Sequence, residues 1–576
     1  MSFKFSSLKS EGSTVPGSNP GYFGADINGT KFIIPLNYGG LGYRFFDQLN
    51  NESDKVLQVD TINNITETKR AVKTRSVRLA IEMQARGVGK NDIILINSKT
   101  HAHQTIVLVA TLFLGAIVCP INPDSPFKEC LELVKKAKPK MCFCDSRTVS
   151  QIDRILLSLN ITSEVVSFGD EVSATIKFVK LFPFKEDTNF KPFFVENPSK
   201  EVAFIVPTQG TCDEPKLVCL SHHNIYLQCL NFMEMLENPS KVISFFPLSW
   251  ITQTIIACSS LEFGVTRIMA PSFNERTACK MIHDFVIDVA VLGSVLALRL
   301  TGNVAVKDFN LSCLKCAVVG VVNTSKNDLM QMRRVLPNVK FIQVYSLTET
   351  GLVAAVPAAN YSEALERPTA VGKLLRNCKV KILDPETKQS VGPGQIGELY
   401  FHGDGLMLGY FKDNSRTIAA IEKGYFKTGD LTKHDGEGWL YLEGRIDDRI
   451  IFEDDIFLPR ELEDCIVAHP QIRDACIIGN NTVLVACVQK KPDSKLTSDN
   501  ILMYLSKVLP QYNNKLSEIV FLDEFPRTSA GNIKKRLLKE QYLKIKIEYT
   551  RSLASISAST FDEVSASQVQ INPPPK

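Results

Sequence analysis

Residues 207–216 read Pro-Thr-Gln-Gly-Thr-Cys-Asp-Glu-Pro-Lys and have residue types that can hold phosphate. They come directly after an apolar run at 202–206 that predicts a strand. The backbone N–H groups and hydroxyls of such a loop can turn toward phosphate oxygens, and Lys216 adds positive charge. No Gly-Lys-Ser/Thr follows, so this is not a Walker loop. An ordinary surface turn has the same composition, and the loop alone leaves both interpretations open.

Length, composition and charge limit the classes of protein that this chain can be. Its 576 residues exceed the usual size of one domain and allow an ample core. Apolar residues make up 44% and charged residues 22%, which excludes a mainly disordered, collagen-like or coiled-coil architecture. A net charge of +4 gives no reason to expect a nucleic-acid partner. The odd number of cysteines, 15, and the lack of an apolar signal segment in residues 1–20 indicate free thiols and a cytoplasmic location.

The elements that must position the loop follow from the hydrophobic pattern. Between about residues 40 and 440, short apolar runs such as 92–97 alternate with amphipathic helical stretches such as 75–85. This alternation predicts α/β units with parallel sheets. Near 436–455 several glycines and an Asp-Asp-Arg run indicate a boundary, beyond which short strands and helices predict a smaller α+β unit. The expected segments are a flexible N-terminus at 1–20, a large domain at 21–446, a small mobile domain at 447–550 and a disordered tail at 551–576.

The longest uncharged stretch, residues 105–122, has about the length of a membrane span. It carries Gly115 inside and Pro120 near its end, and its β-branched residues gather toward the C-terminal side. A buried helix to about Leu114, followed by a short strand that ends at Pro120, explains the same residues. We therefore expect no membrane span.

Short motifs follow the loop in a fixed order. They read Leu220-Ser-His-His-Asn224, Val344-Tyr-Ser-Leu-Thr-Glu-Thr-Gly351, Gly397-Glu-Leu, Gly409-Tyr410, Tyr425-Phe-Lys-Thr-Gly-Asp430, Gly444-Arg-Ile-Asp-Asp448, Pro459-Arg-Glu-Leu-Glu463 and Pro526-Arg-Thr-Ser-Ala-Gly531. With the loop, this series resembles the adenylate-forming superfamily of acyl-CoA synthetases, 4-coumarate–CoA ligases and beetle luciferases over about residues 40–540. The resemblance implies a large domain of mixed sheets flanked by helices, and a small mobile cap.

The resemblance also implies residue roles at the phosphate end of a nucleotide. Glu349 matches the magnesium ligand, and a carboxylate suits a hard cation that bridges phosphates. Tyr345 would line the adenine and Thr348 would reach phosphate oxygens. The phosphate loop and the adenine stretch would contribute Thr208, Gly210, Thr211, Lys216 and Gly320.

At the ribose end, Asp430 matches the acid that accepts both ribose hydroxyls, and Arg445 would add a cation near the ribose. Asp447 matches the hinge residue about which the small domain swings between adenylation and thioester formation. Asp430 or Asp447 as a plain surface charge remains the alternative. The implied reactants are ATP with Mg²⁺, a small-molecule carboxylic acid and CoA, and no carrier domain follows residue 545.

Several residues depart from the family pattern. In the loop, Cys212, Asp213 and Leu217 replace Thr, Gly and Gly, and Asp213 would place a carboxylate beside phosphate. Other departures are Trp250 where many relatives have a histidine near the acyl pocket, Val321 in the adenine stretch, Ser346 for glycine, Asp454 for a glycine beside the pantetheine path, and Ile456 at a position that is usually polar.

The C-terminal motif carries the departure with the largest chemical consequence. Relatives read Gly-Lys-Ile-x-Arg, where the lysine reaches the carboxylate and the α-phosphate, but this chain has Asn532 at that position. The charge that stabilises the transition state is therefore missing. On a helix, Lys535 points closer to the direction of Asn532 than Lys534 does, and it is the candidate substitute.

Two main functions follow. Oxidative luciferase-like chemistry has no distinguishing residue in this sequence, and ligation to the phosphopantetheine of a carrier protein stays open as a further alternative. The first is an acyl-CoA synthetase-like ligase that is slow because of these departures. The second is a pseudoenzyme that keeps the fold and binds a ligand or partner. The C-terminus, Pro-Pro-Pro-Lys, lacks a Ser-Lys-Leu-type address, so a cytoplasmic location is expected over a peroxisomal one.

Overall fold

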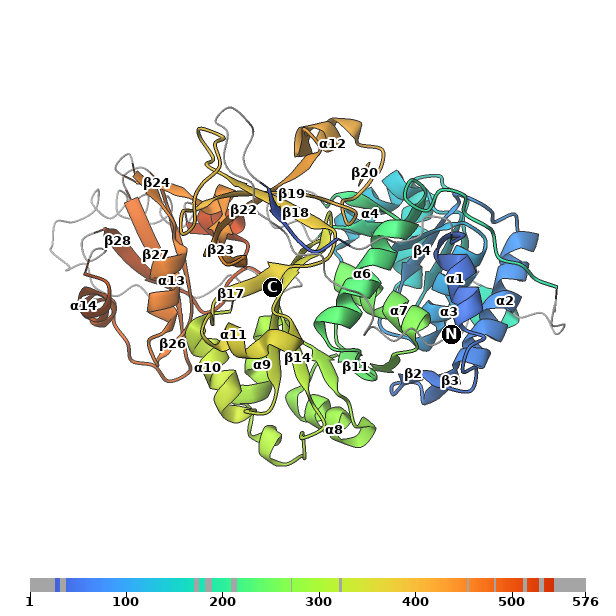
Figure 1. Cartoon of the computed structure of the whole chain (residues 1–576), viewed down its shortest axis with the longest axis horizontal. Coiled ribbons are helices and arrows are strands. Elements are labelled where there is room, and N and C mark those ends of the chain that lie inside the picture. Colours follow the sequence, from blue (N-terminus) through green and yellow to red (C-terminus); the bar gives the residue numbers. More distant parts are fainter. Residues whose placement is uncertain are drawn as a thin grey trace, which may run out of the picture. The chain divides into compact units, whose positions relative to one another are not determined.

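The computed structural model describes residues 26–31, 38–169, 176–181, 189–208, 215–270, 272–320, 324–452, 455–480, 483–510, 515–527 and 533–542. They form a mixed α/β fold with a large, sheet-rich N-terminal part and a small C-terminal part, as predicted (Figure 1). The large compact unit ends at Leu442, and the small unit begins at Glu443 and also takes in Gly429–Leu431. The domain limits at 446 and 447 stay a prediction, and the segments 1–20 and 551–576 lie outside the described residues.

The larger sheet of the large unit combines a parallel and an antiparallel half. The strands from β2 to β15 pair in parallel, with β3 antiparallel at the edge, and β15, β16, β17 and β23 continue antiparallel. In spatial order the described strands are β1 (Ile27–Asn28), β18 (Cys378–Leu383), β19 (Gly397–Gly403), β22 (Tyr425–His434), β23 (Trp439–Arg445), β17 (Ala370–Leu374), β16 (Gly351–Ala355), β15 (Lys340–Leu347), β14 (Cys316–Val319), β13 (Val289–Val291), β11 (Lys241–Ser244), β12 (Thr266–Met269), β2 (Val56–Asp60) and β3 (Ile65–Thr68), with β21 (Ile421–Glu422) paired to β22.

The second sheet is parallel from β9 to β8, and an antiparallel hairpin and an edge strand complete it. Its described strands, in spatial order, are β20 (Gly409–Tyr410), β10 (Leu217–Ser221), β9 (Val202–Pro207), β5 (Ile117–Pro120), β4 (Ile93–Asn97), β6 (Met141–Cys144), β7 (Glu164–Ser167) and β8 (Ile176–Lys177). Successive side chains of β4 point to opposite faces of the sheet, and both faces are covered, which explains the continuous apolar run of this strand. Ile94 and Ile96 face the central core, while Ile93 and Leu95 face the helices on the other side.

A layer of helices lies between the two sheets. Helix α3 contacts β4 and β5 of the smaller sheet and β2 of the larger one, and α6 contacts β9, β10 and β16. This layer consists of α3, α6 and the helices packed against them. Its members are α1 (Gly40–Gln48), α2 (Lys69–Ala85), α3 (Ala102–Phe113), α6 (His222–Met235) and α7 (Ile251–Phe263). Every residue of α3 is buried, which is what an apolar helix between two sheets requires.

The uncharged stretch at 105–122 therefore has the predicted structure. Helix α3 ends at Phe113, and β5 covers Ile117–Pro120. Among the residues that the structure describes, no helix is both long enough and apolar enough to cross a bilayer.

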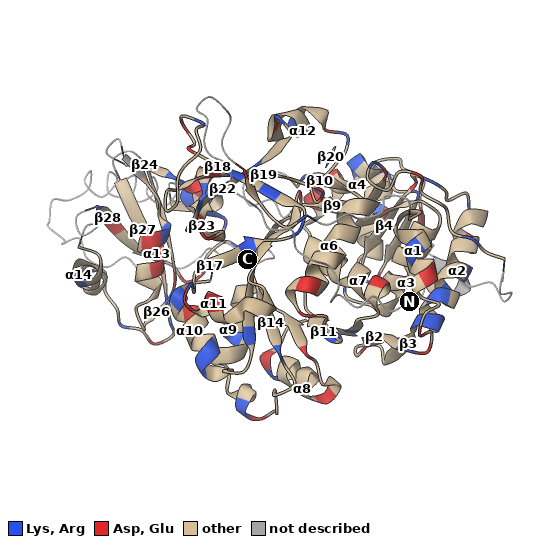
Figure 2. Ribbon diagram, viewed as in Figure 1, with Lys and Arg blue, Asp and Glu red and all other residues tan. Residues whose placement is uncertain are grey.

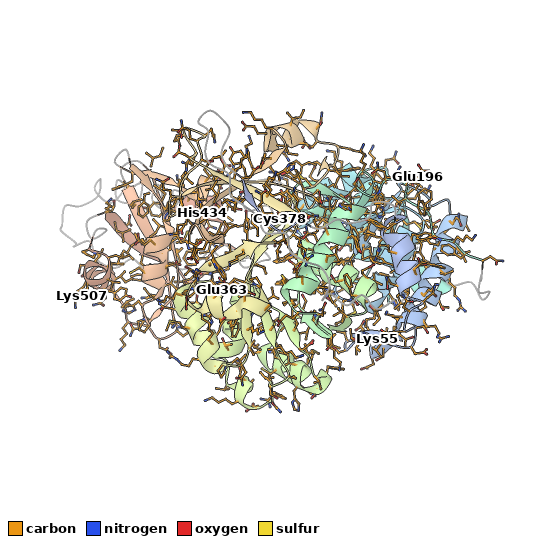
Figure 3. All side chains as sticks on the ribbon, in the orientation of Figure 1. Lys55, Glu196, Glu363, Cys378, His434 and Lys507 are labelled. Atoms are coloured by element: carbon orange, nitrogen blue, oxygen red, sulfur yellow. The ribbon has the colours of Figure 1, made fainter. Side chains whose placement is uncertain are left out.

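Other helices cover the outer faces of the sheets. The smaller sheet is covered by α4 (Phe127–Ala137) and α5 (Val149–Ser158), and the parallel half of the larger sheet by α8 (Glu275–Phe285), α9 (Gly293–Gly302) and α10 (Lys326–Val335). Lys and Arg are interspersed with Asp and Glu along these elements (Figure 2). Each described cysteine is a free thiol, as expected. Cys378, labelled in Figure 3, is 2% exposed, and burial raises the pKa of its thiol to about 12.

The small unit is an α+β fold, as predicted. Antiparallel β26 (Ile472–Asn480) and β27 (Val483–Lys490) pair with β28 (Leu516–Phe521), which is parallel to β27. Leu484 and Ala486 of β27 pack with α13 (Arg460–Val467) and α14 (Ser498–Val508), while Val485 and Cys487 pack with Leu538 in the helical residues 535–542. Both faces of this sheet are therefore covered. The remaining described elements near the unit's start are η5 (Ile446–Asp448), β24 (Ile450–Phe452) and β25 (Asp455–Phe457).

Candidate active site

The base of the phosphate loop is a closed hairpin. Strands β9 and β10 are antiparallel, and Pro207 pairs with Leu217. The N–H of Thr208 donates to the carbonyl oxygen of Lys216 at 2.8 Å, and the N–H of Lys216 donates to Thr208 Oγ1 at 3.0 Å. Leu217 is 2% exposed as the first residue of β10, so leucine fits the strand where relatives have glycine. The predicted site residues Gly210 and Thr211, with Cys212 and Asp213, lie outside the described residues.

Strand β15 brings the other phosphate-end residues to its C-terminal end. Tyr345 lies within the strand and is 5% exposed, and the half-buried Thr348 and Glu349 follow in the turn to β16. Ser346 lies in β15 at a bulge, where the extended backbone does not require the glycine of relatives.

Gly320, which directly follows β14, packs against the neighbouring strand β15. A Cβ at Gly320 would lie 2.8 Å from Val344 Cγ2, so only glycine lets the two strands approach this closely. Gly320 therefore packs against the strand that carries Tyr345. The adjacent Val321 lies outside the described residues.

Tyr410 of β20 connects the loop base to the turn after β15. Its hydroxyl donates to Glu349 Oε1 at 2.9 Å, and Lys216 Nζ lies 5.3 Å from the centre of its ring. The structure thus brings Lys216 and Glu349 to one buried tyrosine, and Thr208 is hydrogen-bonded to Lys216. The sequence motif Gly409-Tyr410 contained this residue, but no role was predicted for it.

Two amides of α6 hold the surrounding turns. Gln228 Nε2 donates to the carbonyl oxygen of Thr350 at 3.3 Å, and Gln228 Oε1 accepts from the N–H of Leu352 at 2.7 Å. Gly351 has a φ of +64°, and a Cβ there would lie 2.3 Å from Gln228. Asn224 Nδ2 donates to the carbonyl oxygen of Asp404 at 2.6 Å. Sequence reasoning missed Gln228, although Gly351, two residues after the Thr-Glu pair, is a sign of a close contact.

Two aromatic side chains of the large unit, His222 and Trp250, are buried. His222, at the start of α6, accepts the N–H of Leu41 on Nδ1 at 3.1 Å, and burial lowers the pKa of its imidazole to about 4. Trp250 is 8% exposed, and its ring stacks on Phe246 at 4.7 Å between centroids. Trp250 therefore forms a stacked aromatic pair with Phe246 at the start of α7.

The ribose-end residues belong to the small unit. Asp430 is 4% exposed, and Arg445 Nη1 donates to its Oδ1 at 2.8 Å. A Cβ at Gly429, whose φ is +70°, would lie 3.1 Å from Arg445 Nη2. Asp447 is exposed in η5, directly after this pair. Because Glu349 belongs to the large unit, the prediction that Glu349 and Asp430 hold one nucleotide stays a prediction.

Lys535, the candidate substitute for the missing lysine, has carboxylate partners in the small unit. Its Nζ lies 3.1 Å from Glu463 Oε1 and 3.6 Å from Asp448 Oδ2. Glu463 Oε1 also accepts the N–H of Ile477 at 2.8 Å. The two carboxylates raise the pKa of Lys535 above its ordinary value, against the opposing effect of burial. Its charge is thus neutralised within the small unit. Asn532 and Asp454 lie outside the described residues.

The donors near the loop base fit Mg²⁺ that arrives with a nucleotide. Within the described ranges, no three or more His, Cys, Asp or Glu side chains form a group that could hold a metal ion. Mg²⁺ commonly takes one or two carboxylates and fills its other positions with water and phosphate oxygens. A half-buried carboxylate at Glu349, beside the hydroxyl of Thr348, fits that donor set.

Comparisons with known proteins match most of the chain. The family model for AMP-binding enzymes matches residues 45–411, and that for the AMP-binding enzyme C-terminal domain matches residues 461–532. 4-Coumarate–CoA ligase-like 9 of Arabidopsis thaliana is 24% identical over 487 residues, which cover 83% of this chain and 84% of the relative. Luciferin 4-monooxygenase of Photuris pensylvanica is 25% identical over 491 residues, which cover 82% and 89%.

Solved structures share the fold. ATP-bound MatB from Rhodopseudomonas palustris has a TM-score of 0.79 at 21% identity and covers 88% of this chain and 99% of that one. O-succinylbenzoate Coenzyme A synthetase from Bacillus subtilis, in complex with AMP, has a TM-score of 0.75 at 20% identity, with 86% and 98% covered. Because the family models match well over half of its residues, this chain belongs to the AMP-binding family of adenylate-forming, acyl-CoA ligase-like enzymes.

Proposed function

We propose that this chain activates a small carboxylic acid with ATP and transfers the acyl group to CoA. A carboxylate oxygen attacks the α-phosphorus, which forms acyl-AMP and releases pyrophosphate. The sulfur of CoA then attacks the acyl carbonyl carbon, AMP leaves, and the thiol proton passes to solvent. The observation that carries this proposal is the arrangement of Lys216, Tyr410 and Glu349 at the base of the loop.

In this proposal each residue has a separate task. Thr208, Lys216 and the loop between them hold the phosphates, Tyr345 lines the adenine, and Thr348 reaches phosphate oxygens. Glu349 would hold Mg²⁺, which when bound neutralises phosphate charge. Asp430, oriented by Arg445, would accept the ribose hydroxyls. The small domain, proposed as 447–550, would pivot at Asp447 against an adenylation domain at 21–446.

We expect the adenylation step to be slow. Asn532 is neutral and short, and loss of one electrostatic contact to a transition state commonly costs about a hundredfold in rate. Lys535 is held by Glu463 and Asp448, which weakens its candidacy as a substitute. The same observation favours the second candidate, a degenerate enzyme that binds a ligand or partner through the retained fold. A cytoplasmic location remains part of the proposal.

Acid-dependent exchange of labelled pyrophosphate into ATP separates the two candidates. The purified chain is tested with fatty and aryl acids, and Glu349→Gln serves as the inactive reference. Exchange that requires an acid and is lost in the reference supports the ligase and refutes the degenerate enzyme. Binding of MgATP without exchange by any acid refutes the ligase and supports the alternative.

A further inference from the structure

Three hydrogen bonds fix the backbone at and around Tyr410. The N–H of Leu408 donates to the carbonyl oxygen of Cys219 at 2.9 Å, and the N–H of Phe411 donates to that of Leu217 at 2.7 Å. Both acceptors lie on β10, directly after the phosphate loop. The N–H of Tyr410 donates to Thr417 Oγ1 of helix α12 (Asn414–Ala420) at 2.9 Å. Tyr410 is therefore placed by the same strand that places Lys216.

The same segment also holds Glu349 at its backbone. The N–H of Met407 donates to the carbonyl oxygen of Glu349 at 2.8 Å, while the hydroxyl of Tyr410 donates to the carboxylate at 2.9 Å. Two anchors from one short segment restrict both the main chain and the side chain of Glu349. A hydrogen bond to a carboxylate is stronger than a neutral one and fixes the direction of the acceptor.

The ring of Tyr410 acts on Lys216 in a different way. The ammonium lies 5.3 Å from the ring centre, a distance at which the negative face of the ring attracts a cation. An aromatic face orients the lysine and does not neutralise its charge. The hydroxyl of Tyr410 thus binds the carboxylate of Glu349, and the face of its ring attracts the ammonium of Lys216.

We propose that Tyr410 is a positioning residue that aligns the Glu349 carboxylate for a divalent cation and Lys216 for the phosphates of the same nucleotide. This inference rests on the proposed function, because it takes Glu349 as the ligand of the metal. A purely structural tyrosine would contribute to folding but would not change how Mg²⁺ affects nucleotide affinity. The dependence of ATP affinity on Mg²⁺ therefore separates the two roles.

The test measures the Kd of ATP by calorimetry with and without Mg²⁺, for the full chain and for variants. Tyr410→Phe keeps the ring over Lys216 and removes only the hydroxyl. We expect it to lower the gain in affinity on adding Mg²⁺ about tenfold and to leave the affinity without Mg²⁺ unchanged. Tyr410→Leu, which also removes the ring, should weaken ATP binding about threefold even without Mg²⁺.

Two further variants control the result. Tyr542→Phe removes a matched bond from a tyrosine hydroxyl to a carboxylate, the 2.7 Å contact with Glu518 in the small unit, and should leave both affinities unchanged. Thr417→Val releases the backbone of Tyr410 without touching Glu349. It should also lower the gain in ATP affinity on adding Mg²⁺, by a smaller factor than Tyr410→Phe does. This variant tests the proposal if Tyr410→Phe fails to fold.

The outcomes distinguish this inference from the function beneath it. If Mg²⁺ strengthens ATP binding equally in the wild type, Tyr410→Phe and Thr417→Val, the positioning role is wrong while the proposed function stands. If the wild type binds ATP but gains nothing from Mg²⁺, Glu349 is not a metal ligand and the inference is overturned with that role. If the wild type binds no ATP, both are overturned.

Discussion

Two lysines with different surroundings mark the two units of this protein. Lys216, at the base of the phosphate loop, lies against the face of Tyr410, whereas Lys535, in the small unit, lies between Glu463 and Asp448. An aromatic face leaves a positive charge available to a ligand, but two carboxylates neutralise it. In the proposed function the cation of the large unit is available to phosphate. The cation of the small unit is paired with carboxylates of the same unit.

This difference divides the departures from the family pattern into two kinds. Leu217 and Ser346 replace glycines in strands where the backbone is extended, so the elements form without them. Asn532 replaces a charge, and Lys535, the candidate substitute, is already paired with Glu463. The strands form without a glycine at these two positions, and we expect the loss of the charge at residue 532 to have the larger effect on function.

The largest expected effect comes from restoring the missing charge. Asn532→Lys should raise acid-dependent pyrophosphate exchange about a hundredfold, because an ammonium again meets the charge that develops at the α-phosphorus. Asn532→Gln, of similar length but neutral, is the matched control and should give no gain. If lysine also gives no gain, the defect lies in the phosphate loop, at Cys212 or Asp213.

The second prediction concerns the stability of the large unit in acid, where the buried, uncharged imidazole of His222 must take up a proton. His222 has a folded pKa of about 4, below its unfolded value of 6.5, so the unfolded chain takes up the proton first. The stability that it contributes is complete above pH 6.5 and is lost as pH falls toward 4, by roughly 3 kcal/mol at pH 4. Urea denaturation of the large unit at a series of pH values should show this loss in its free energy of unfolding.

His222→Gln should flatten that pH dependence, since an amide oxygen can still accept the N–H of Leu41. His283→Gln, at an exposed position, should leave the dependence as it is in the wild type. An unchanged slope in His222→Gln would show that other groups cause the acid sensitivity.

The third prediction tests the charged cluster of the small unit. Lys535→Met leaves the partly buried carboxylate of Glu463, whose side chain is 17% exposed, without its cation and should destabilise the small unit by about 2 kcal/mol, less than for a fully buried pair. The double variant Lys535→Met/Glu463→Gln should recover part of this loss. In the wild type the raised pKa of Lys535 means that its contribution is present below pH 10.5 and is lost as pH rises further.

If Lys535→Met instead abolishes pyrophosphate exchange while the small unit remains folded, the lysine takes part in the chemistry, and the contrast with Lys216 is wrong. Exchange at the wild-type rate by the folded variant would agree with the purely structural role.

The smallest effect is expected at the ribose end. Arg445 has a side chain that is 42% exposed, so its ion pair with Asp430 is screened by solvent and should contribute less than about 1 kcal/mol to stability. Arg445→Met should therefore change unfolding little but should weaken the binding of AMP. AMP affinity equal to that of the wild type would show that Arg445 does not orient Asp430 for the ribose.

Local patterns predicted most of the elements but not the partners of charged side chains. Gly115 and Pro120 were enough to divide the stretch at 105–122 into α3 and β5, because their conformational limits act within a few residues. Lys535 and Glu463 are 72 residues apart, and no periodicity connects them. The role of Tyr410 could not be predicted for the same reason, because it depends on the pairing of β20 with β10, a strand much earlier in the sequence.

The pairing of β20 with β10 makes chain length between the motifs a determinant of the site. Val218 stands opposite Tyr410, and Cys219 stands opposite Gly409. Neighbouring residues of a strand point to opposite faces, so a slip of one position would send the phenol away and leave a bare glycine facing Glu349. We therefore expect an insertion or deletion between residues 404 and 408 that shifts this register to impair the proposed activity with every functional residue intact, and such indels should be rarer among working relatives than substitutions there.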